Sequence, residues 1–150
     1  MQTATNVAWE GRWEEAIRAY QRALGEFPES VDALAGLGMA YTSIGRPGDA
    51  LDAYRRASEL EPDDPVLLER IGKALEQLGR EEEAARAFLT CGKRYMDQQE
   101  APHLAAECWE TAARLDPACI EARASLLKYY QRQGRVGKAV DECLALARIY

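Results

Sequence analysis

The stretch that decides the fold is residues 31–64, VDALAGLGMAYTSIGRPGDALDAYRRASELEPDD. Its apolar residues recur at intervals of three and four, which is the spacing of one face of an amphipathic helix. The pattern is interrupted at Gly45-Arg46-Pro47 and stops near Pro62. Glycine can take the left-handed conformation that follows a helix end, and proline is tolerated in the first turn of the next helix. The stretch therefore predicts two helices joined by a tight turn at Gly45, and Asp64-Pro65 predicts the start of a third.

The same pattern recurs along the chain. The dipeptide Gly-Arg occurs at Gly11, Gly45, Gly79 and Gly134, at intervals of 34, 34 and 55 residues. Five residues after each glycine stands an alanine, and further matched positions follow nine and twelve residues after it. These three sets are Ala16, Ala50, Ala84 and Ala139; Tyr20, Tyr54, Phe88 and Cys143; and Ala23, Ala57, Cys91 and Leu146. We expect the first three alanines to lie where helices cross closely, and the aromatic residues and Trp109 to fill the core.

This lattice resembles the tetratricopeptide repeat family, whose 34-residue helix-turn-helix unit carries a loose pattern of Trp, Leu-Gly, Tyr, Gly, Ala, aromatic, Ala and Pro. Residues 31–64 match it most fully, with Leu34, Leu37-Gly38, Tyr41, Gly45, Ala50, Tyr54, Ala57 and Pro62. Residues 1–30 read as a truncated first repeat, 65–98 as a repeat with an extended second helix, and 99–150 as partial repeats. The second helix of 65–98 is expected to run on because Met96 stands where the family has proline.

The resemblance implies an all-α fold: antiparallel helix-turn-helix repeats stacked in a right-handed superhelical solenoid of nine helices, in a single domain over 1–150. The 55-residue interval in the second half departs from the family. It predicts an atypical three-helix period, with helices near 47–59, 65–78 and 81–98 copied near 102–115, 118–133 and 135–150. Because short connections alternate helix direction, an odd helix number predicts that helices 65–78 and 118–133 run antiparallel to each other.

Composition and motifs bear on what the chain can do. Its 25 acidic and 19 basic residues are interspersed and give a net charge of −6, so the basic surface that nucleic acid requires is not expected. The first residues carry no basic or apolar leader pattern, and no apolar run reaches the roughly 18 residues of a membrane span. We therefore expect a cytoplasmic protein without a membrane segment. Glycine-rich phosphate loops and nucleophile elbows are missing from the sequence, which predicts neither catalytic residues nor a cofactor.

The cysteines and the single histidine do not have the spacing of a metal site. Cys91, Cys108, Cys119 and Cys143 are widely and unevenly separated, with no Cys-x-x-Cys pair, and His103 is alone. Cys91 and Cys143 fall on apolar helix faces of the predicted register. We expect reduced thiols that behave as small hydrophobic core residues rather than disulfides.

The family resemblance also implies a binding surface, because family members bind partners on a concave face lined by the first helix of each unit. The positions that match this face are Asp32, Ala35, Met39, Thr42, Ser43, Val66, Glu69, Lys73, Glu76 and Gln77. Their mixed chemistry suits an extended or helical peptide. Ala35 and Met39 depart from the basic and asparagine clamp that holds a terminal carboxylate, which disfavours that ligand. The predicted function is a non-enzymatic scaffold that binds a protein or peptide in this groove.

Two alternatives to the groove stay open. Solenoids need polar end helices to remain soluble, and the last predicted helix carries Leu144, Leu146, Ile149 and Tyr150 near an uncapped edge. This edge predicts either self-association of the chain into a homo-oligomer or a fragment of a larger multi-repeat scaffold.

Overall fold

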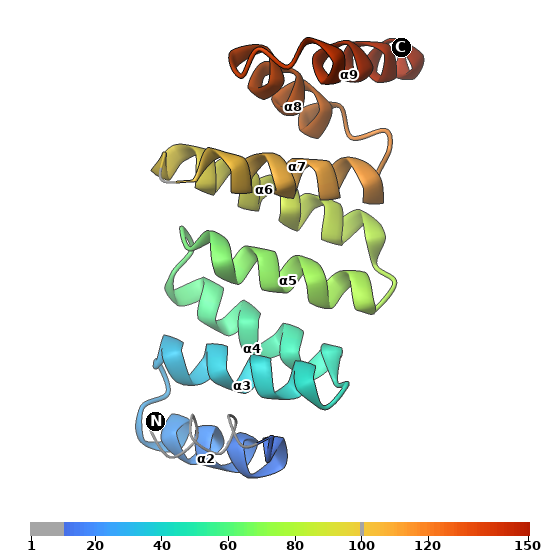
Figure 1. Cartoon of the computed structure of the whole chain (residues 1–150). Helices are drawn as coiled ribbons and strands as arrows, with labels where there is room; N and C mark the ends of the chain where they lie inside the picture. Colours follow the sequence, from blue (N-terminus) through green and yellow to red (C-terminus); the bar gives the residue numbers. More distant parts are fainter. Residues whose placement is uncertain (1–10, 100) are drawn as a thin grey trace. The chain divides into compact units, whose positions relative to one another are not determined.

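The computed structural model describes residues 11–99 and 101–150, and these residues form eight α-helices without a strand (Figure 1). The helices are α2 (Trp13–Glu26), α3 (Val31–Ser43), α4 (Pro47–Leu60), α5 (Pro65–Gln77), α6 (Glu81–Gln98), α7 (Pro102–Leu115), α8 (Ile120–Arg132) and α9 (Val136–Ile149). From residue 47 onward the predicted bounds are confirmed to within two residues. The first of the nine predicted helices falls on residues 1–10, which lie outside the described residues.

Glycine and proline set the helix bounds as the sequence predicts. Gly45 and Gly79 have φ angles of +74° and +73°, a left-handed conformation that a side chain resists. Each follows the end of a helix and lets the chain turn back, so both predicted turns are confirmed. The Asp64 carboxylate accepts a hydrogen bond of 2.8 Å from the Val66 backbone N–H and caps α5, which begins at Pro65.

Helix α6 is longer than the other described helices because no proline stops it. It continues past Met96 to Gln98, as predicted. The chain then leaves the helix through Gln99, whose φ of +55° is left-handed, and its backbone N–H donates to the Met96 carbonyl. This left-handed residue does at the end of α6 what glycine does at the end of α3 and α5.

The chain divides into two compact units, Met1–Gly79 and Arg80–Tyr150. The predicted single domain and the predicted antiparallel relation of helices 65–78 and 118–133 span both units and stay predictions, as does the 55-residue period. In the described part of the chain, no helix is both long and apolar enough for a membrane crossing.

In the first unit, α3 packs between α2 and α4, and α5 packs on α4. Two aromatic rings press directly on the α3 backbone: Tyr20 of α2 lies against Gly36, and Tyr54 of α4 lies against Gly38. A methyl group on Gly38 would come within 2.5 Å of the Tyr54 ring, so only glycine allows this approach. Both tyrosines are buried, which confirms the predicted core role of these aromatic positions.

In the second unit, α6 packs against α7, and α8 packs against α7 and α9. The α6–α7 contact is close because the Trp109 indole lies on the α6 backbone at Gly92, where an added Cβ would come within 2.7 Å of the indole Cδ1. Phe88 and Trp109 are buried, as predicted. Among the cysteines, Cys91 is buried as predicted. The prediction of a core position for Cys143 is wrong, because it lies exposed on α9, where it lines a hollow with Leu127 and Gln131 of α8.

Candidate functional site

The first part of the predicted binding surface lies on α3. The Ser30 hydroxyl caps this helix by accepting the Ala33 N–H at 3.2 Å. Met39 is 42 % exposed, and Asp32 is also exposed, whereas Ala35 is half-buried. Helix α3 therefore presents an apolar side chain and a carboxylate to solvent.

The two hydroxyl residues of this surface are tied to their own helix. Thr42 Oγ1 donates to the Gly38 carbonyl at 2.9 Å, and Ser43 Oγ donates to the Met39 carbonyl at 3.0 Å. Both side chains are exposed, and each oxygen still has lone pairs with which to accept. They can accept a hydrogen bond from a partner without losing their helix contacts.

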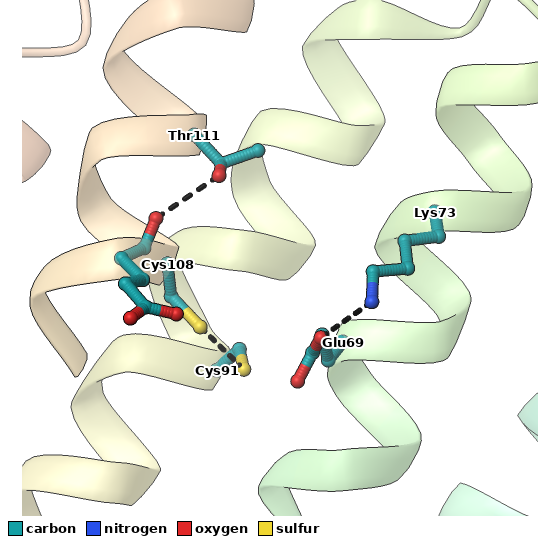
Figure 2. A network of polar contacts seen from close by, with 6 residues as sticks. Glu69, Lys73, Cys91, Cys108 and Thr111 are labelled. Carbon is teal, nitrogen blue, oxygen red and sulfur yellow. Dashed lines mark hydrogen bonds and ion pairs between the residues drawn. The ribbon is translucent and has the colours of Figure 1, made fainter. Parts of the chain in front are cut away.

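The second part of the surface lies on α5. Val66 is 43 % exposed in the first turn, and two turns further Lys73 Nζ forms an ion pair of 2.6 Å with Glu69 Oε1 (Figure 2). Gln77 is exposed and Glu76 half-buried at the end of the helix. Because Lys73 is already paired with Glu69, this part of the surface is close to neutral and is not a strong anion site.

Arg70 connects the two helices and was missed by the sequence analysis. Its Nη1 lies 4.0 Å from the Met39 Sδ, and its guanidinium carbon lies 5.8 Å from the centre of the Tyr54 ring. A planar guanidinium stacks favourably on an aromatic face. Arg70 stands four residues after Val66, so helical spacing alone could have added it to the predicted set. We call the ten predicted residues together with Arg70 the α3–α5 face.

A hollow of about 420 Å³ lies elsewhere in the first unit and contains none of the ten predicted residues. Leu24, Leu37 and Ala53 form its apolar part, and its polar lining includes Gln21, Tyr41, Asp49, Asp52 and Arg56. Gln21 Nε2 donates to the Tyr41 hydroxyl at 3.2 Å, and the Arg46 guanidinium lies 5.0 Å from the Tyr41 ring centre. Some of the polar groups that line the hollow therefore already form hydrogen bonds with each other.

A polar cluster joins three helices of the second unit. The Tyr130 hydroxyl of α8 donates to Glu110 of α7, and Lys138 of α9 lies 3.7 Å from the same carboxylate and 5.1 Å from the Tyr130 ring centre. Burial, and then the hydrogen bond to the Glu110 carboxylate, raise the pKa of Tyr130 well above its ordinary value. The phenol stays protonated and acts as a donor that holds α8 to α7, which is a structural role.

The predicted apolar edge on α9 is partly confirmed. Leu144 and Tyr150 are exposed, whereas Leu146 and Ile149 are half-buried. The structure adds Val136 and Val140, which are 71 % and 48 % exposed. Val136, Val140 and Leu144 follow one another at four-residue spacing and form one stripe. We call these three residues the α9 stripe.

These surfaces consist of apolar side chains, hydroxyls and charged groups, some of which pair with one another. Among residues 11–99 and 101–150, no three His, Cys, Asp or Glu side chains gather as a metal ion would require. The arrangement can make apolar contacts, hydrogen bonds and ion pairs to a chain laid across the helices. Helix pairs with glycine turns, small residues at the crossings and aromatic residues on helix backbones define a helical-repeat protein.

The sequence profile of the tetratricopeptide repeat family matches residues 10–65, 43–90 and 92–150. The chain belongs to this family, which confirms the resemblance and the all-α fold class. No curated protein sequence matches it.

Solved structures of similar fold include MamA, at 24 % identity and a TM-score of 0.56 over 99 % of this chain and 95 % of that one. PcrH in complex with the chaperone-binding region of PopD gives 20 % identity and a TM-score of 0.70 over 76 % of this chain and 86 % of PcrH. The type III secretion chaperone SycD of Yersinia enterocolitica, in complex with a peptide of the translocator YopD, gives 18 % identity and a TM-score of 0.69 over 76 % of this chain and 87 % of SycD. At these identities the likeness shows the fold.

Proposed function

We propose that this chain is a non-enzymatic scaffold of the cytoplasm that binds an extended or helical segment of another protein on the α3–α5 face. The observation that carries the proposal is the exposure of Met39 and Val66, which are 42 % and 43 % accessible on neighbouring first helices of two repeats. Apolar side chains at this level of exposure gain free energy when a partner covers them. Two proteins of similar fold, PcrH and SycD, were solved with bound segments of other proteins, which supports the same kind of role here.

The chemistry of the face indicates what the bound segment carries. Met39 is flexible and polarizable and adapts to varied apolar side chains. Arg70 next to it supplies a charged donor, whereas Asp32 and the Glu69–Lys73 pair surround the apolar part with both signs of charge. The segment we propose has one or two large apolar anchors flanked by polar residues of mixed charge.

Reversing the character of the face is expected to weaken binding at least tenfold. A displayed library of random peptides would be selected on the unaltered chain, and the best peptide, labelled with a fluorophore, titrated by anisotropy. Met39→Glu places a carboxylate where an apolar anchor is covered, and Lys73→Glu sets a second negative charge beside Glu69. A tenfold loss corresponds to about 1.4 kcal/mol, which one misplaced charge readily costs.

The matched control for Met39→Glu is Leu60→Glu. Leu60 is 41 % exposed at the end of α4 and does not belong to the α3–α5 face. This variant makes the same chemical change at the same exposure and is expected to bind the peptide as the unaltered chain does. Equal loss in both variants, or no loss in Met39→Glu, would contradict the proposed face. Circular dichroism of each variant separates lost binding from lost folding.

A second candidate function is self-association, which the α9 stripe favours. In the repeat register Val140 corresponds to Leu51 and Ala85, which are both 2 % exposed. These two residues stand on α4 and α6, against which the next helices α5 and α7 pack. The stripe is thus the kind of face that an amphipathic helix covers elsewhere in this chain. The α9 helix of a second copy carries such a stripe, and a twofold axis would place the two stripes against each other.

The mass in solution tests this candidate. If the α9 stripe pairs with itself, light scattering is expected to give a mass that rises above 16.7 kDa with concentration. Val140→Asp is expected to restore the mass of a single chain, because it buries a charge in the pair. Phe27→Asp, at a residue that is 66 % exposed in the first unit, is the control and is expected to leave the dimer intact. A constant mass of 16.7 kDa would argue against self-association.

A further inference from the structure

We propose that Cys91 and Cys108 are a covalent modification site, at which a peroxide closes a disulfide that locks α6 to α7. The two sulfur atoms lie 3.0 Å apart in the folded chain and point toward one another (Figure 2). This is closer than the roughly 3.5–4.0 Å at which even the smaller carbon atoms pack. A disulfide bond measures about 2.05 Å, so a sulfur displacement on the order of 1 Å brings the pair to bonding distance.

The helices hold the two cysteines opposite each other through their neighbours in the sequence. Cys91 precedes Gly92 on α6, and Cys108 precedes Trp109 on α7. The Trp109 indole packs on the α6 backbone at Gly92. This contact, one residue away from each cysteine, fixes how far one helix can slide along the other. Sliding one helix past the other would separate the sulfurs and also remove the indole from its seat. The folded unit therefore keeps the thiols paired.

Burial determines which reagent can reach the pair. Cys91 is 0 % exposed and Cys108 is 5 % exposed, whereas Cys143 is exposed and Cys119 half-buried. Bulky alkylating reagents are expected to label Cys143 first, and only a small oxidant is expected to reach Cys108. A peroxide is such an oxidant, and the proposal places its first attack at Cys108, the less completely buried residue of the pair.

The chemical steps balance with one peroxide per chain. The Cys108 thiolate attacks a peroxide oxygen, the O–O bond breaks, and a sulfenic acid forms with release of water once the leaving oxygen is protonated. Cys91 Sγ then attacks the sulfenic sulfur, the S–O bond breaks, and a second water leaves. The two thiols lose two electrons and two protons, and hydrogen peroxide is reduced to two waters. The nearness of Cys91 favours this second step over further oxidation of Cys108.

The test uses the whole chain with Cys119→Ser and Cys143→Ser, which leaves only the buried pair. Folded protein is treated with hydrogen peroxide, and intact-mass spectrometry is expected to show the loss of two hydrogens, reversed by dithiothreitol. Peptide mapping is expected to find Cys91 joined to Cys108 in a single chain. The urea midpoint of the oxidised form is expected to shift upward and to return on reduction, because the cross-link constrains the unfolded chain.

The control adds Cys108→Ser to the same background, so that one thiol of the pair remains and no internal disulfide can form. This variant is expected to show neither the mass loss nor the shift of the urea midpoint. Three results would overturn the proposal: unchanged thiols under peroxide, sulfinic acid at Cys108 without a cross-link, or a disulfide that forms faster in urea than in the folded chain. The last result would show that the folded arrangement does not bring the sulfurs together.

Discussion

Replacing Trp109 with alanine is expected to lower the free energy of unfolding by roughly 3–5 kcal/mol, the cost found for removing a large buried aromatic residue. Trp109 is 5 % exposed, and its indole lies on the backbone of α6 at Gly92. Glycine leaves no side chain that could move into the vacated space, so a cavity would remain between α6 and α7. Since whole domains are stable by only about 5–15 kcal/mol, this one change removes much of the margin.

The measurement is urea unfolding followed by circular dichroism, with Trp109→Phe as the comparison. Among the residues that the structure describes, the buried indole Nε1 finds no hydrogen-bond partner, which itself costs stability. Phenylalanine removes that donor and keeps much of the ring. The decrease in the free energy of unfolding is therefore expected to be well below that of Trp109→Ala. A loss below about 1 kcal/mol in Trp109→Ala would mean that the α6–α7 contact is not the core of its unit.

The helices and their bounds could be read from the sequence because each signal is local. The glycines at 45 and 79, and the prolines at 47 and 65, decide where a helix ends or begins whatever lies across from it. The repeat register likewise predicted that Tyr54 and Phe88 are buried, since every repeat places the same position toward its neighbour. Local chemistry and a fixed period were sufficient for these features.

Features that depend on which helix lies opposite could not be read in the same way. Cys143 stands at the same register position as Tyr54 and Phe88, yet it is exposed and lines a hollow beside Leu127 of α8. The approach of Cys91 to Cys108 spans 17 residues, which is no multiple of the repeat, and it depends on how α6 crosses α7. Arg70 could have been added to the α3–α5 face from its four-residue spacing after Val66, but a repeat pattern does not describe the contacts of its guanidinium with Met39 and Tyr54.

For the ten predicted binding positions, the sequence predicted which side chains are exposed to solvent more reliably than it predicted their interactions. Met39 and Val66 are exposed apolar residues as the family register implies. The ion pair between Glu69 and Lys73 was not foreseen, although the two stand four residues apart on one helix. It makes Lys73 a poorer anion contact than its isolated charge indicates. Whether a partner binds these positions stays a proposal for the peptide titration to decide.

Replacing Gly38 with alanine is expected to destabilise the chain by about 1–3 kcal/mol, against the ordinary preference of helices for alanine. The added methyl would lie 2.5 Å from Cε1 and 2.7 Å from Cδ1 of Tyr54. The Tyr54 ring is only 3 % exposed, so it has little room to withdraw. Either α4 moves away from α3 or the ring leaves its rotamer, and both outcomes lose core contacts.

Gly25 makes the matched control, because it lies inside α2 and an added Cβ there would meet no atom of the described residues within 4 Å. Gly25→Ala is expected to stabilise the chain by up to about 1 kcal/mol, through the helix preference alone. The same substitution thus changes sign between two helices of one unit. Urea unfolding of both variants measures this difference, and stabilisation by Gly38→Ala would contradict the packing of Tyr54 on α3. The family pattern carries glycine at this position. The result would therefore also explain that glycine, because the aromatic ring of the second helix leaves room for a hydrogen atom and not for a methyl group.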